Sequence, residues 1–181
     1  MLTRQLLKCK IIDMENNTIT NGELGSFRLP RYNELPDMGL YLEQVVKYMN
    51  ICLSPLGCVE ITSFMISNYV KKGLVRNPIK KQYYAAHLAE LFFVVLGKRV
   101  LSIENTGKML QLITSGPSNH EVYDYCCTEF ENRLFYVYGI SHEIPALDVE
   151  ESETKMLLDE VITAVVLSIH LDFWFNKPER K

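Results

Sequence analysis

The chain has 181 residues, of which 48% are hydrophobic and 23% are charged, a composition typical of globular proteins. Its five cysteines are an odd number with no C-x-x-C pair, which argues against a disulfide framework and a structural zinc site. Residues 1–17 lack the apolar stretch of a secretion signal, and the apolar run at 161–171 is shorter than the about 20 residues that a membrane span needs. We therefore expect a soluble cytoplasmic protein that needs no membrane, metal or cofactor.

The net charge of −3 is distributed unevenly. No acidic residue lies between Glu60 and Glu90. A basic patch in an otherwise acidic protein is the pattern expected where a polyanion touches one face, and an ordinary solvated surface is the alternative explanation. The cations of this window are Lys71, Lys72, Arg76, Lys80 and Lys81.

The periodicity of apolar residues predicts a mainly α-helical fold. Residues 1–38 are punctuated by glycine, proline and asparagine, and we expect an extended arm there with short strand pairing. Residues 39–54 carry apolar side chains at the three-and-four spacing of one helix face. A second helix is predicted at 62–72, where Thr62 is a good N-cap residue and Gly73 provides a left-handed C-terminal cap.

A turn or wing is predicted at 76–83. The helix that follows from about Ala85 is apolar on both sides, so we expect both of its faces to be buried. Ser102 can cap a fourth helix that reaches Thr114.

The C-terminal third is predicted to form two further helices. The first is amphipathic, is rich in tyrosine and phenylalanine, and ends near Gly139. The last begins in the acidic segment 148–153, which suits the positive end of a helix dipole. Residues 115–117, Ser-Gly-Pro, indicate a domain boundary. We therefore divide the chain into an N-terminal arm (1–38), a central domain (39–114) and a C-terminal helical region for dimerisation or effector binding (115–181).

The predicted helix 62–72 has an apolar side and a polar side. A helical wheel places Met65, Ile66 and Tyr69 on the inward side. A polar helix edge can enter a major groove, where asparagine pairs with adenine and lysine reaches guanine or phosphate. The outward side carries Ser63, Phe64, Ser67, Asn68 and Lys71.

This helix and the chain after it carry a recognisable series of residues. An aromatic residue precedes a Gly-Leu pair, and a basic residue stands two positions before a tyrosine. A helix with one polar residue and two spaced leucines follows, and the next helix opens with a serine and an apolar residue. The residues concerned are Tyr69, Gly73, Leu74, Lys81, Tyr83, His87, Leu88, Leu91, Ser102 and Ile103. This series resembles the MerR superfamily. More closely, the stretch 29–110 resembles the bacterial family called domain of unknown function 1836, which is regarded as MerR-like.

The resemblance implies a MerR-like winged helix-turn-helix module followed by a C-terminal helical hairpin or bundle. In such a module the recognition helix (62–72) faces base edges and the basic wing (76–83) lies against backbone phosphates. The DNA-binding residues that it implies are Ser63, Ser67, Asn68, Lys71, Lys72, Arg76, Lys80, Lys81 and Tyr83.

Nothing in the sequence predicts an enzyme, because it has no phosphate-binding glycine loop and no nucleophile elbow. We expect His87 to pack or to neighbour a phosphate. We expect Cys126 and Cys127 to be buried thiols, since adjacent helical residues point about 100° apart and cannot readily share one metal ion. A solvated acidic face is expected at Asp124, Glu129 and Glu131.

The sequence leaves two questions open. The aromatic residues of the fifth helix fit core packing, and they also fit a dimer interface or a pocket for a small apolar effector. The whole pattern fits a homodimeric transcriptional regulator that binds duplex DNA. The alternative is a protein-interaction or scaffold module that keeps the winged-helix shape without DNA binding. Phe64 on the polar edge favours this alternative, as does Ser67, which stands where the MerR pattern usually has an arginine.

Overall fold

The computed structural model describes residues 24–57, 60–114, 119–147 and 152–175. This part of the chain is mainly helical, as predicted, and pairs extended segments only through isolated bridges. The elements are η1 (Tyr32–Glu34), α3 (Leu42–Leu53), η2 (Ser54–Leu56), α4 (Ser63–Lys71), α5 (Ala85–Gly97), α6 (Ile103–Thr114), α7 (Asn119–Val137) and α8 (Glu153–Phe175).

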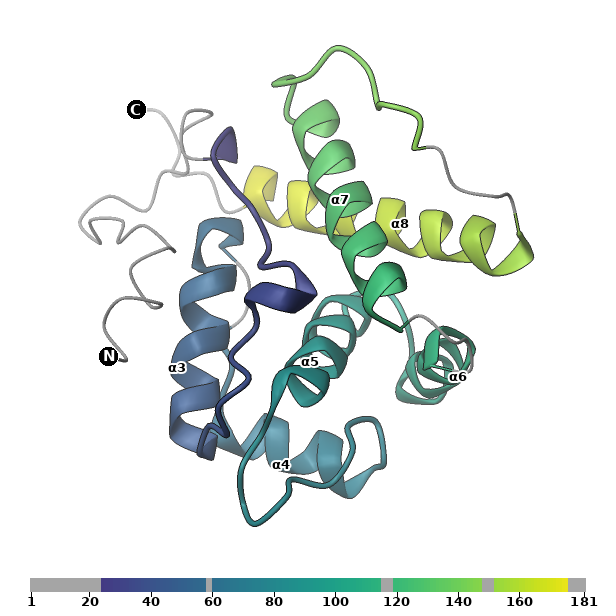
Figure 1. Cartoon of the computed structure of the whole chain (residues 1–181). Coiled ribbons are helices and arrows are strands. Elements are labelled where there is room, and N and C mark those ends of the chain that lie inside the picture. The colour runs from purple at the N-terminus through teal and green to yellow at the C-terminus, as the bar shows by residue number, and fades with distance from the viewer. Residues whose placement is uncertain (1–23, 58–59, 115–118, 148–151, 176–181) are drawn as a thin grey trace, which may run out of the picture.

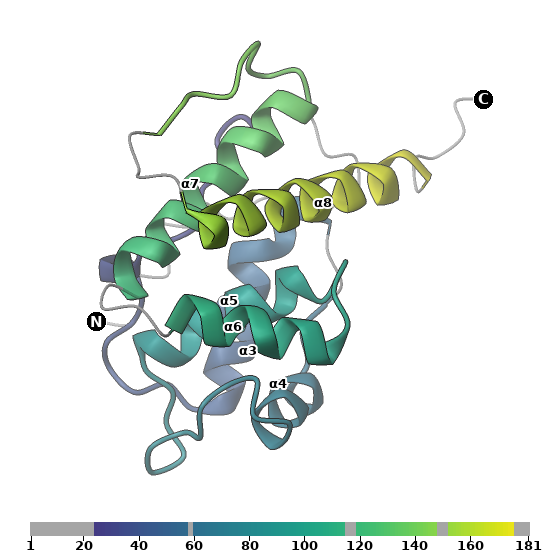
Figure 2. The ribbon, with the colours of Figure 1, turned by 90° about the vertical axis from the view of Figure 1, so that its right-hand side faces the viewer.

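The helices form two groups that share one core. Helices α3 to α6 make the first group, and α7 and α8 cross each other at the opposite end of the molecule from α4 (Figures 1 and 2). Helix α5 links the groups because it contacts α6, α8 and η1. Its Leu88, Leu91 and Val94 are fully buried and Phe93 on another face also packs on the core, so the prediction of a helix buried on both faces is confirmed.

Local signals end the helices where the sequence predicts. The hydroxyl of Thr62 accepts a hydrogen bond from the amide of Met65 and caps α4. At the other end Gly73 has a φ of +71°, and the amide of Leu74 donates to the carbonyl of Tyr69, which is the Schellman arrangement. The hydroxyl of Ser102 accepts from the amide of Asn105 and caps α6 in the same way.

The described part of the N-terminal arm is fixed to α7 by carboxylates. Glu131 accepts hydrogen bonds from the Leu29 amide and from both terminal nitrogens of Arg31, each at 2.7 Å. Asp124 accepts from the Tyr32 amide at 2.7 Å. The expectation of a solvated acidic face is therefore wrong for α7, because these groups receive the arm. Residues 1–23 lie outside the described residues.

Helices α7 and α8 confirm the predicted C-terminal helical region. Tyr123 and Phe130 of α7 are buried, which supports core packing, whereas Tyr136 is exposed. Glu129 is buried as well and forms an ion pair with Arg133. The acidic segment 148–151 lies outside the described residues. Among the helices that the structure describes, none combines the length and the apolar character needed to cross a membrane.

Candidate nucleic-acid interface

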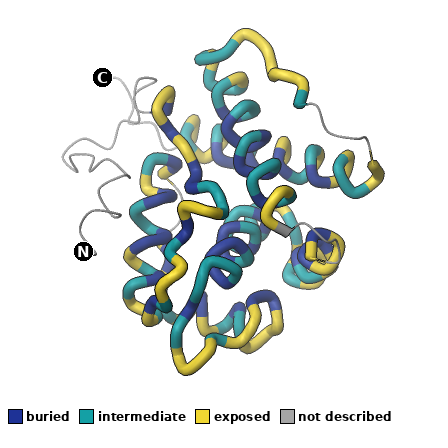
Figure 3. Tube along the Cα trace, in the orientation of Figure 1, coloured by how far each residue is buried: buried dark blue, intermediate teal, exposed yellow. Residues whose placement is uncertain are grey.

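Helix α4 presents the polar edge that the sequence predicts. Ile66 and Tyr69 are buried against the core, so the opposite side faces solvent. Ser67 and Lys71 on that side are exposed. Ser63 and Asn68 lie on the same side and are half-buried. Phe64 also lies there, and its side chain is 80% exposed. Figure 3 shows exposed stretches in α4 and in the wing, at the same end of the molecule.

The wing, residues 76–83, has at its tip a two-residue turn made of Lys80 and Lys81. Ile79 and Gln82 exchange two backbone hydrogen bonds of 3.0 and 2.9 Å across this turn. Lys80 and Lys81 both have positive φ, 50° and 66°, as in a type I′ turn, where Asn-Gly is the usual pair. The left-handed conformation is unfavourable for lysine, so the turn stores strain while it holds two exposed cations at its tip.

The C-terminal end of the wing is fixed to the segment just before α3. Tyr83 and Leu40 exchange two backbone hydrogen bonds of 2.8 Å each, two residues before α3 begins. The side chain of Tyr83 is only 5% exposed, and this burial raises its pKa. Tyr83 therefore lies in the core, beneath the exposed surface that carries the lysines.

His87 fixes the start of the wing from inside. It is 1% exposed; its Nδ1 accepts from the Tyr84 amide at 3.0 Å, and its Nε2 lies 3.1 Å from the Asn77 carbonyl. Because Nδ1 accepts, the ring proton is on Nε2 and is donated to Asn77. Of the roles expected for His87, the structure shows packing.

Arg76 is the one cation of the basic window whose charge is matched by an acidic residue in the described structure. Its side chain contacts the Glu90 carboxylate of α5 at 2.7 Å from Nε and 2.6 Å from Nη2, and its amide donates to the same group. Sequence reasoning missed this pair, although Glu90 closes the acid-free window. The cations that remain exposed are Lys71, Lys72, Lys80 and Lys81.

The fold brings α4 and the wing to the same end of the molecule, as both views show (Figures 1 and 2). Exposed apolar side chains accompany them, namely Phe64, Ile79, Tyr41 and Met38. Sequence periodicity singled out Phe64 alone among these, since Ile79 lies in a turn and the other two precede a helix. The surface thus combines exposed cations, amide and hydroxyl groups, and some apolar side chains.

Comparison with protein families assigns a family to the part of the chain that builds this surface. A family model, domain of unknown function (DUF1836), matches residues 30–127, more than half of the chain. The chain belongs to the DUF1836 family. Comparison with curated proteins and with solved structures gave no match. The DUF1836 match extends from the arm into α7, and so it crosses the boundary predicted at 115–117 and includes the carboxylate of Asp124 that holds the arm.

Proposed function

We propose that this DUF1836 protein is a transcriptional regulator that binds duplex DNA through α4 and the wing, in the manner of a MerR-like winged helix-turn-helix module. The observation that carries the proposal is that α4, with its polar edge, and the wing lie at one end of the fold and both carry exposed cations. A cationic surface of this kind attracts DNA by releasing counterions from its phosphates.

Within this proposal the residues have two roles. Lys71 and Lys72 at the C-terminal end of α4, and Lys80 and Lys81 at the tip of the wing, lie against phosphates and position the module. Ser67 and the half-buried Ser63 and Asn68 face base edges, where the Asn68 amide matches adenine. Arg76 remains with Glu90 and supports the wing from the side.

Helix α8 supplies the dimer surface in our proposal. Helix α8 buries one face, formed by Leu158, Ile162, Val165, Val166 and Ile169, yet large apolar residues also lie on its exposed side. An outer seam follows the alternating three- and four-residue spacing of a coiled coil from Leu157 to Trp174, or about 27 Å of the helix. The outer seam consists of the exposed residues Leu157, Glu160, Ala164, Leu167, Leu171 and Trp174.

Two copies of the outer seam match best when they run antiparallel. A twofold axis between Ala164 and Leu167 then places these two opposite each other, with Glu160 opposite Leu171 and Leu157 opposite Trp174 of the second copy. The two Glu160 carboxylates stand about 16 Å apart along the helix axis. A parallel pair would place them side by side in an apolar seam. The dimer would present two DNA-binding modules to two half-sites.

A binding titration tests the DNA proposal. Fluorescence anisotropy with a labelled duplex of mixed sequence should show binding that weakens steeply with salt. Lys80→Glu combined with Lys81→Glu should abolish most of this binding for every sequence, whereas Lys80→Arg combined with Lys81→Arg keeps the charge and should bind. Equal binding by the two double variants would remove the wing from the interface.

The second candidate is a protein-interaction or scaffold module. The 80% exposure of Phe64 favours it, because a phenyl ring in water gains from an apolar partner. Recovery of bound material from cell extract, with and without nuclease, separates the candidates: a DNA-mediated association is lost after nuclease treatment, and a direct protein partner is retained.

A further inference from the structure

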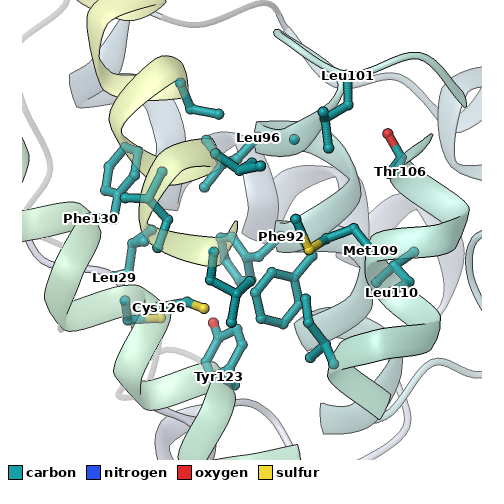
Figure 4. Close-up of a pocket in the computed structure, with 18 residues that line it drawn as sticks. Leu29, Phe92, Leu96, Leu101, Thr106, Met109, Leu110, Tyr123, Cys126 and Phe130 are labelled. Carbon is teal, nitrogen blue, oxygen red and sulfur yellow. The ribbon is translucent and has the colours of Figure 1, made fainter. Parts of the chain in front are cut away.

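An apolar cavity lies where the two groups of helices meet. Its volume is about 60 Å³, and its walls come from α5, α6, α7, α8 and the arm (Figure 4). Its walls include Phe92 and Leu96 of α5, Met109 of α6, Cys126 of α7 and Val165 of α8. Protein interiors contain few voids larger than a water molecule, and atoms facing a void lack packing partners on that side. An occupant would therefore stabilise the surrounding helices.

None of the described residues that line the cavity is charged, and the two hydroxyl groups among them already donate hydrogen bonds within the protein. The Thr106 hydroxyl donates to the Ser102 carbonyl at 2.8 Å, and the Tyr123 hydroxyl donates to the Pro30 carbonyl at 3.0 Å. Burial raises the pKa of Cys127 to about 12 and that of Cys126 as well, so both sulfurs stay protonated at neutral pH. The site excludes ions, metals and strongly polar molecules, and it accepts hydrocarbon.

The size of the cavity limits the shape of the occupant. A cavity of about 10–15 Å³ is enough to hold one water molecule, and a cavity of about 150 Å³ accommodates benzene. The 60 Å³ available here holds a short alkyl segment, whereas an aromatic ring requires more space. The cavity therefore fits the narrow apolar end of an uncharged molecule.

Helix α5 connects the cavity to the wing. Phe92, Phe93 and Leu96 form part of the wall, and one turn earlier on the same helix Glu90 holds Arg76 and His87 holds Asn77. Because these residues share one helix, an occupant that packs against the cavity wall also stabilises the segment on which the wing is fixed.

We propose that this cavity binds the short alkyl part of an uncharged ligand, and that its occupation stabilises α5 and the wing. Ligand binding to the cavity does not depend on the proposed DNA binding. Only a regulatory effect of the ligand on DNA affinity rests on the proposed function.

Nuclear magnetic resonance on the full chain tests both statements, with dissolved propane as the probe and benzene as the size control. The methyl signal of Met109, assigned by its loss in Met109→Leu, should shift saturably with propane and stay unchanged with benzene. Val165→Leu adds a methylene to the wall and should abolish the shift, whereas the matched variant Val46→Leu in α3, which does not line the cavity, should keep it. Amide exchange of Gln82, which reports on the wing turn, should slow severalfold with propane.

Each outcome decides one statement. No saturable Met109 shift in the wild-type chain overturns the site, and this result needs no variant to fold. An equal response to benzene overturns the assignment to an alkyl group. A Met109 shift without slower Gln82 exchange supports the binding site but overturns its connection to the wing. None of these outcomes depends on DNA, so failure of the DNA titration is distinguishable from failure of the cavity proposal.

Discussion

The side-chain amide of Asn50 in α3 forms two hydrogen bonds with the backbone of Ile61, which directly precedes the cap of α4. Its Nδ2 donates to the Ile61 carbonyl at 2.9 Å, and its Oδ1 accepts from the Ile61 amide at 2.8 Å. The link between the two helices is longer than the three- or four-residue turn of a standard helix-turn-helix. Asn50 therefore fixes the end of a long link and, with it, the direction in which α4 starts.

Replacing this amide should destabilise the fold. Ile61 is buried, so Asn50→Leu leaves a buried donor and a buried acceptor without partners, and we expect a loss of about 2 kcal/mol or more in the free energy of unfolding. Urea denaturation followed by circular dichroism measures it. The same change at the exposed Asn105 of α6 should stay within about 0.5 kcal/mol. Equal effects at the two positions would contradict the role of Asn50.

The turn of the wing should show opposite effects on stability and binding. Lys80→Asn combined with Lys81→Gly installs the residue pair that a type I′ turn prefers, and we expect the unfolding free energy to rise by about 1 kcal/mol as left-handed strain is relieved. The same double variant removes both cations from the tip, so DNA affinity should fall. Thermal unfolding and anisotropy on one preparation check both. A less stable variant would show that the positive φ values carry no strain.

The outer seam of α8 should control the oligomeric state. Leu167→Glu places a carboxylate near the proposed twofold axis, and we expect the dimer dissociation constant to rise more than tenfold, because a large apolar burial is replaced by a charge. Glu160→Leu should have the opposite effect and tighten the dimer. Sedimentation equilibrium measures both. A wild-type chain that stays monomeric at high concentration would remove α8 from the assembly.

Alkaline conditions should destabilise the protein through its buried thiols. Burial raises the pKa of Cys127 from its ordinary value of 9.0 to about 12, and it raises the pKa of Cys126 too. At a pH between these two pKa values, the thiol is deprotonated in the unfolded chain and protonated in the folded chain. Unfolding therefore releases protons, and the free energy of unfolding falls as the pH rises.

We expect this loss to begin near pH 9 and to approach about 1.4 kcal/mol per pH unit for each thiol. Urea denaturation between pH 8 and 10 in reducing buffer measures the slope, and Cys126→Ala combined with Cys127→Ala should flatten it. An unchanged slope in that double variant would assign the alkaline effect to other groups, such as the tyrosines of α7.

The sequence determined the helices and their ends. Thr62, Gly73 and Ser102 act on backbone groups only a few residues away, so their effect on helix ends is readable from local order. The apolar periodicity of α5 likewise showed that it would be buried on both faces. The basic window was visible for the same reason, because its lysines are neighbours along the chain.

Only the tertiary structure decided which of those residues share the surface. Glu131 is 100 residues from Arg31, and no local pattern distinguishes a buried carboxylate that receives an arm from one on a solvated helix face. The sequence also did not predict the pairing of Arg76 with Glu90 or the burial of Tyr83, because both depend on how the wing folds back onto α5. Short-range backbone chemistry is encoded locally, whereas the environment of a charge is set by chain segments that meet only in the folded protein.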